Sequence, residues 1–167
     1  MRKVLIPTDF SARSLKLAEY AFELYSKEII NLILVYPYKM PLFDSELYGF
    51  SPNQIITALE NEEFSTAKTF LINRFYRNIH SIETALFTGT NSIDFKNFRD
   101  EHNIQTAIVP QKGFLDFSRS TTFDPLHYIQ KNIPEAHITD IDKKDRIIPY
   151  SNGTMSDFPL YKSLQQQ

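Results

Sequence analysis

The sequence contains no cysteine and only four glycines among its 167 residues. Without cysteine, the chain has neither a disulfide framework nor a thiolate nucleophile. The four glycines, Gly49, Gly89, Gly113 and Gly153, are widely separated. Phosphate-binding loops of the P-loop and dinucleotide-binding types need clustered glycines, so enzymes that use either loop are excluded.

The sequence also lacks an excess of positive charge and a long apolar segment. It has 18 basic and 20 acidic residues, giving a net charge of -2, and the two signs are interspersed. Such a chain has no basic footprint for nucleic acid. No apolar run approaches the roughly 20 residues that a membrane helix needs. We therefore expect a cytoplasmic protein without nucleic-acid or membrane partners, and the start of the sequence, which runs directly into a strand, agrees with this.

No pattern of catalytic or metal-binding residues is evident. The four histidines show none of the paired spacings typical of metal ligands, and no G-x-S-x-G sequence supplies a nucleophile elbow. We therefore expect no metal site and no catalytic residue.

Strand-like apolar runs alternate with helix-like segments along the first 141 residues. This alternation predicts a three-layer α/β/α domain built on an open parallel sheet. The expected strands are Lys3–Pro7, Ile30–Tyr36, Ile82–Phe87, Ile104–Pro110 and Ala136–Ile141. The expected helices are Ser11–Lys27, Asn53–Tyr76, Asn91–Asp100 and Asp124–Lys131. We divide the chain into one domain, residues 1–141, and a polar tail, residues 142–167.

A possible binding corner follows the first strand. Thr8, Asp9 and Ser11 come directly after an apolar run, and ligands of open α/β sheets lie beyond the carboxyl ends of such strands. The same residue types also cap helices, so a purely structural role for Asp9 or Ser11 is the competing interpretation. Tyr36, Tyr38 and Phe43, around the end of the second strand, are aromatic candidates for a ligand contact or for the packing of a lid.

The segment Lys3-Val-Leu-Ile-Pro-Thr-Asp-Phe-Ser11, followed by a Leu/Ala-rich helix and by Ile30-Asn-Leu-Ile-Leu-Val-Tyr36, resembles the universal stress proteins. The resemblance implies a Rossmann-like, adenine nucleotide alpha hydrolase-like fold with strand order 3-2-1-4-5. It also implies a nucleotide site where strands 1 and 4 diverge. The positions that match the family's nucleotide contacts are Pro7, Thr8, Asp9 and Val35.

The sequence departs from the family after the fourth strand. Nucleotide-binding members carry one glycine there, a second three residues later, and a Gly-Ser or Gly-Thr ten residues after that. Here the only glycine is Gly113, and Asp124 would place a carboxylate near the phosphates. Glycines let backbone N–H groups approach a phosphate, so we interpret this segment as a degenerate phosphate loop. Its candidate residues are Gln111, Gly113, Arg119, Ser120 and Thr121.

These observations favour a non-catalytic regulatory or stress-response module that has lost tight ATP binding and needs no cofactor. The alternative is an adenine-nucleotide switch that binds ATP or AMP with magnesium through an unconventional loop and hydrolyses ATP slowly or not at all. Relatives often pair through their last strand, so we expect a homodimer formed by the edge that carries Ile138 and Ile141. A different protein partner is also possible.

Overall fold

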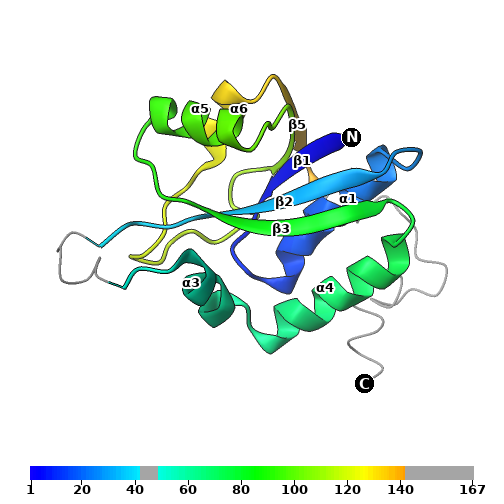
Figure 1. Ribbon diagram of the computed structural model, residues 1–167, viewed down its shortest axis with the longest axis horizontal. Coiled ribbons are helices and arrows are strands. Elements are labelled where there is room, and N and C mark those ends of the chain that lie inside the picture. The colour runs from blue at the N-terminus through cyan, green and yellow to red at the C-terminus, as the bar shows by residue number, and fades with distance from the viewer. Residues whose placement is uncertain (42–48, 142–167) are drawn as a thin grey trace.

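The computed structural model describes residues 1–41 and 49–141 (Figure 1). The tail 142–167 and Phe43 lie outside the described residues. Five parallel strands form one sheet in the order β3-β2-β1-β4-β5, which is the order that the family resemblance implied. The strands are β1 (Arg2–Pro7), β2 (Ile30–Pro37), β3 (Ile79–Phe87), β4 (Thr106–Pro110) and β5 (Glu135–Thr139).

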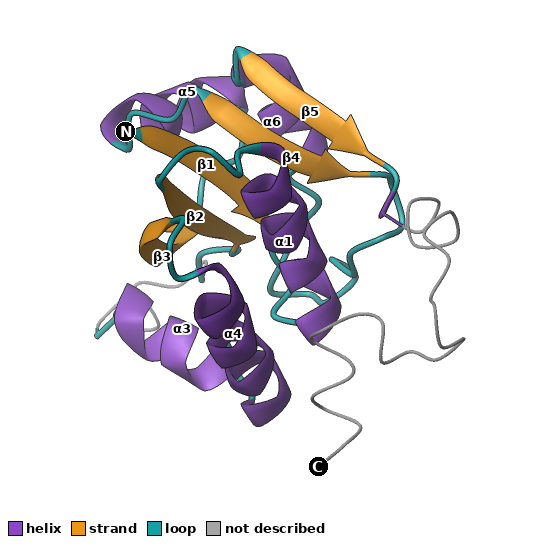
Figure 2. Ribbon diagram, turned by 90° about the vertical axis from the view of Figure 1, so that its right-hand side faces the viewer, coloured by secondary structure: helices purple, strands orange, loops and turns teal. Residues whose placement is uncertain are grey.

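Helices cover both faces of the sheet (Figure 2). One face carries α1 (Leu15–Leu24), which follows a 3-10 turn at Ala12–Ser14, together with α3 (Pro52–Leu59) and α4 (Glu62–Phe75). The other face carries α5 (Ser92–Glu101) and α6 (Leu126–Asn132). The expected three-layer α/β/α architecture is confirmed.

Alternate residues of the central strands build two separate cores. Val4, Ile6 and Leu32 pack with α1 and α4, whereas Leu5 and Ile33 pack with α5 and α6. Successive side chains of a strand point to opposite faces, so a central strand between two helical layers has to be apolar throughout. This constraint explains the continuous apolar runs Val4–Pro7 in β1 and Leu32–Val35 in β2.

The prediction of a single helix over Asn53–Tyr76 is wrong, because the chain forms α3 and α4 with a break between them. Glu60 has an extended backbone, and the Asn61 side chain accepts a hydrogen bond from the Phe64 N–H at 2.8 Å. Asn61 is therefore a helix cap and not a mid-helix residue. Its amide also donates to the Phe10 carbonyl at 3.4 Å, which ties the start of α4 to the loop after β1.

The prediction that Ile141 lies on the exposed edge of the last strand is also wrong. β5 ends at Thr139, and Ile141 is buried among the residues that pack with α1 and α4. Ile138 remains on the strand and is 56% exposed. The alternation of apolar and polar residues did not reveal that the chain leaves the sheet after Thr139, or that Ile141 then points into the core. The exposed edge therefore carries Ile138 without Ile141.

A buried carboxyl group lies between α1 and α4. Glu19 is 5% exposed and pairs with Arg74, while its Oε2 has no hydrogen-bond partner within the described part of the chain. Burial raises the pKa of Glu19, and the attraction of Arg74 opposes this rise only in part. The folded state therefore holds the proton of Glu19 more tightly than the unfolded state does.

We expect the Glu19→Gln variant to gain stability over the parent protein as the pH rises. Because the pKa is raised in the folded state, the stabilising contribution of the protonated carboxyl is full at low pH and is lost as the pH rises through the folded pKa. Glutamine keeps a neutral group at all pH values. Arg74 is 35% exposed and also lies near Glu23, so the substitution does not leave it buried without a counter-charge.

Urea unfolding at several pH values tests this expectation. The free energy of unfolding of Glu19→Gln, relative to the parent protein, should rise by about 1 kcal/mol between acid and mildly alkaline pH. Glu23→Gln is the comparison variant, because Glu23 is 41% exposed and is only a lesser cause of the raised pKa of Glu19, so its trend should be smaller. A parallel pH profile for Glu19→Gln and the parent protein would contradict the expectation.

Gly89, in the connection from β3 to α5, occupies a position with no room for a side chain. A Cβ atom there would lie 2.4 Å from the Asp94 Cβ and 2.7 Å from the Phe87 ring. Gly113 contrasts with it, because its φ of +92° demands glycine for conformational reasons while nothing lies within 4 Å of its added Cβ.

We expect Gly89→Ala to lower the free energy of unfolding by about 1–3 kcal/mol, since the clash involves a ring and a helix side chain that are already packed. Gly113→Ala should cost about 1 kcal/mol, through backbone strain alone. Chemical denaturation of both variants measures the difference. A smaller loss in Gly89→Ala than in Gly113→Ala would show that the β3–α5 connection shifts freely.

Candidate functional site

The loop after β1 is a closed hydrogen-bonded turn. Thr8 is fully buried, and its hydroxyl shares a 2.9 Å hydrogen bond with the Ser14 hydroxyl and accepts the Phe10 N–H at 3.0 Å. These contacts hold Phe10 at a φ of +60°, a left-handed conformation that is uncommon for a bulky residue. The hydroxyl of Thr8 is therefore used within the turn.

Asp9 connects this turn to a distant part of the chain. Its Oδ1 accepts hydrogen bonds from the Ser11 N–H at 2.9 Å and the Ser11 hydroxyl at 2.5 Å. Its Oδ2 accepts the N–H of Asp116 at 2.9 Å, from the connection between β4 and α6. Ser11 in turn caps the 3-10 turn by accepting the Ser14 N–H at 3.2 Å. Both oxygens of Asp9 thus have structural partners.

The first half of the β4–α6 connection folds against this corner. Phe114 and Leu115 are buried there, and the Arg13 guanidinium lies 4.3 Å from the centre of the Phe114 ring. Hydrogen bonds from Ser118 hold the pKa of Asp116 below its usual range, so this carboxylate is ionised at neutral pH.

Two carboxylates, those of Asp9 and Asp116, lie at this corner. The Asp116 N–H, the kind of group that binds phosphate, already donates to Asp9. Of the other candidates, Gln111 and Gly113 are exposed in a turn closed by the hydrogen bond from the Phe114 N–H to the Gln111 carbonyl.

Pro7 and Val35, the remaining positions matched to nucleotide contacts, are buried partners in the sheet. They face one another in the register of β1 and β2, and the Val35 carbonyl accepts the Thr8 N–H at 2.9 Å. Val35 packs on the α5 and α6 side of the sheet with 0% exposure. Its side chain belongs to the core.

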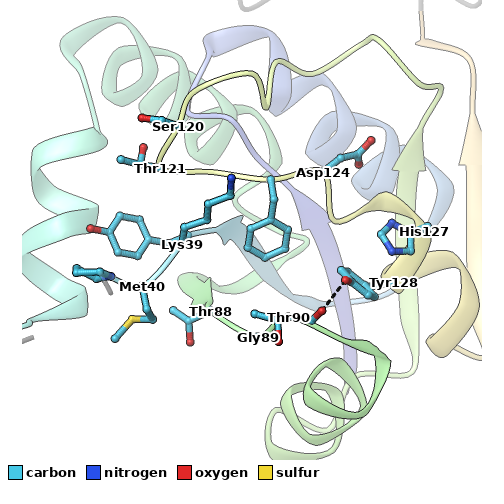
Figure 3. Close-up of a pocket in the computed structure, with 13 residues that line it drawn as sticks. Lys39, Met40, Thr88, Gly89, Thr90, Ser120, Thr121, Asp124, His127 and Tyr128 are labelled. Carbon is cyan, nitrogen blue, oxygen red and sulfur yellow. Dashed lines mark hydrogen bonds between the residues drawn. The ribbon is translucent and has the colours of Figure 1, made fainter. Parts of the chain in front are cut away.

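An open cleft of about 910 Å³ lies at the carboxyl ends of β2 and β3, next to this corner (Figure 3). Three segments line it: the chain after β2, the chain after β3, and the second half of the β4–α6 connection with the first turns of α6. The lining residues are Tyr38, Lys39, Met40, Pro41, Thr88, Gly89, Thr90, Ser120, Thr121, Phe123, Asp124, His127 and Tyr128.

Hydrogen bonds between these segments shape the cleft. The Lys39 N–H donates to the Thr121 carbonyl at 2.9 Å, and the buried Thr122 hydroxyl donates to the Pro37 carbonyl at 2.6 Å. On the opposite side, the Tyr128 hydroxyl donates to the Thr90 carbonyl at 2.9 Å (Figure 3). The β4–α6 connection is thus held across the end of β2, and α6 is held against the start of α5.

Only some of the residues that the sequence assigned to the phosphate loop line the cleft. Ser120, Thr121 and Asp124 line it, whereas Gln111, Gly113 and Arg119 do not. Asp124 also accepts the Leu126 N–H at 2.9 Å, so it acts as a cap at the start of α6.

Sequence reasoning missed several residues of the cleft. Of the aromatic candidates, Tyr38 lies in the cleft, while Tyr36 is buried against Phe10 with ring centroids 5.0 Å apart. Lys39, Thr88 and Thr90 were missed. They are the first polar residues after β2 and β3, so the carboxyl-end rule could have identified them, had it been applied to every strand.

Across residues 1–41 and 49–141, none of the helices has the length and apolar composition that spanning a bilayer requires. No group of three or more histidine, aspartate or glutamate side chains is arranged to hold a metal ion there.

Comparison with protein-family models and with curated protein sequences found no match. Solved structures do match. Hypothetical protein MJ0577 aligns at 13% identity with a TM-score of 0.51, covering 83% of this chain and 95% of that protein. Universal stress protein UspA from Lactobacillus plantarum aligns at 13% identity with a TM-score of 0.47, covering 83% and 96%.

A universal stress protein in complex with cAMP aligns at 15% identity with a TM-score of 0.48, covering 84% of this chain and 97% of that one. Identities this low are evidence about the fold alone. The strand order 3-2-1-4-5 seen here is the order that the resemblance implied. The chain thus shares the Rossmann-like α/β fold of the MJ0577 structure, with which it aligns over 83% of its length.

Proposed function

We propose that this chain is a non-catalytic regulatory or stress-response module of the cytoplasm, with a universal-stress-protein-like fold and without tight ATP binding. The proposal is supported mainly by the bond from the Asp116 N–H to Asp9. That bond uses both a carboxylate and a backbone donor at the place where an open α/β sheet would receive a polyphosphate. Opening the corner for ATP would break it and would separate the buried Phe114 and Leu115 from the core.

We expect Mg-ATP at millimolar concentration to leave the melting temperature unchanged within about 1 °C. A ligand that binds only the folded state stabilises it by about 2.7 kcal/mol at one hundred times its Kd, which corresponds to about 5–10 °C for a chain of this length. Differential scanning fluorimetry with Mg-ATP, Mg-AMP and magnesium chloride alone measures the shift.

The Asp9→Ala variant is the matched control. It should melt at a lower temperature, because its hydrogen bonds to Ser11 and Asp116 are lost, and it should remain insensitive to Mg-ATP. A marked rise in the melting temperature of the parent protein with Mg-ATP, absent in Asp9→Ala, would replace this proposal with an adenine-nucleotide switch.

We further propose that the module is a homodimer that pairs through β5; a different protein partner would use the same edge. β5 is hydrogen-bonded only to β4 among the described strands, and Ile138 exposes 56% of its surface on it. An exposed edge strand with an apolar residue favours pairing with another strand.

We expect Ile138→Lys to convert the dimer into a monomer, since a charged side chain on an edge strand opposes pairing. Ile93→Lys is the control, because Ile93 is 69% exposed on α5, away from this edge. Light scattering of both variants gives the mass. An Ile138→Lys protein with the mass of the parent dimer would reject this interface.

A further inference from the structure

The cleft at the ends of β2 and β3 has walls of fixed aromatic rings. Tyr38 stacks on Phe50 with ring centroids 6.1 Å apart, and Phe123 lies edge-on to Phe87 at 5.8 Å. Tyr128 is held by its hydrogen bond to Thr90. Rings that are already fixed lose little conformational freedom when a ligand binds, so such walls favour a planar apolar body. The volume of about 910 Å³ suits a small molecule.

Three backbone donors around the cleft are already in use. The N–H of Lys39 donates to the Thr121 carbonyl, and the N–H of Thr90 donates to the Asp94 carboxylate at 2.9 Å. The N–H of Leu126, at the start of α6, donates to Asp124. Phosphate binding at a turn or a helix start depends on free N–H groups. These three positions therefore provide no cradle for a phosphate.

The cleft does contain one available cation. Lys39 is exposed, and no ion pair joins its ammonium group to a carboxylate in the described part of the chain. In Figure 3 its side chain extends across the middle of the cleft, while the carboxylate of Asp124 points away from it at the rim. One ammonium group balances one negative charge.

We propose that this cleft binds a small aromatic monoanion, with its ring system between the aromatic walls and its carboxylate at the ammonium group of Lys39. A doubly charged phosphate is disfavoured, because Lys39 balances only one negative charge and Asp124 adds a carboxylate to the lining of the cleft. Three N–H groups next to the cleft also have acceptors already. The inference goes beyond the proposed function and does not depend on it, since the cleft has no lining residue from β1 or from the loop after β1.

Three naphthalene probes that differ only in their polar group test the inference: 2-naphthoate, 2-naphthamide and 2-naphthyl phosphate. The chain has no tryptophan, so naphthalene fluorescence can be followed without interfering indole emission. We expect the full-length protein to bind 2-naphthoate about fivefold more tightly than 2-naphthamide, which is the effect of one exposed charge pair, and more tightly than the phosphate.

Lys39→Met should make the affinities for naphthoate and naphthamide equal, and Lys39→Glu should reverse their order. Lys112→Met is the control, because Lys112 is equally exposed in the β4–α6 connection but does not line the cleft, and it should keep the preference of the parent protein. Circular dichroism verifies that the variants are folded.

Three outcomes would overturn the inference: no binding of any probe at millimolar concentration, tighter binding of the phosphate than of the carboxylate, or an unchanged preference in Lys39→Met. Stabilisation by Mg-ATP that depends on Asp9 would overturn the proposed function instead, and would leave the behaviour of the naphthoate series unaffected. The two failures are therefore distinguishable.

Discussion

The attachment of the β4–α6 connection at two points determines the chemistry of this end of the sheet. One point is the hydrogen bond from the Asp116 N–H to Asp9 after β1, and the other is the hydrogen bond from the buried Thr122 to the Pro37 carbonyl after β2. Both cross long stretches of sequence. The Thr122 bond is buried, and leaving its hydroxyl unpaired there would cost about 1–3 kcal/mol. These two attachments direct the path of the connection across the end of the sheet.

That path divides the carboxyl end of the sheet into two regions. Over β1 and β4, the connection contributes buried Phe114 and Leu115 and leaves no free donor on Asp116. Over β2 and β3, it forms one wall of an open cleft that contains Lys39 and several rings. The chain itself thus supplies the partner of Asp9 after β1, and the cleft lies one strand further toward the β3 edge.

Much of the fold could be predicted because it follows from local rules. Continuous apolar runs identified the central strands β1, β2 and β4, since a strand covered on both faces buries the side chains of both faces. The errors have local causes as well. Asn61 was counted as part of a helix although its side chain caps α4, and Ile141 was assigned to β5 although the strand ends at Thr139 and the chain turns inward. In both cases a polar cap or a turn overrode the apolar periodicity.

The sequence by itself determined the α/β class, the five strands, and the absence of a glycine-rich phosphate loop, because each depends on residue types that are close together in the chain. Only the tertiary structure decided which polar side chains remain available to contact a ligand. Asp9 has a partner 107 residues away, and Lys39 faces residues that follow two other strands. Such relations depend on where the connections cross in space, and no pattern within a short stretch of sequence records them.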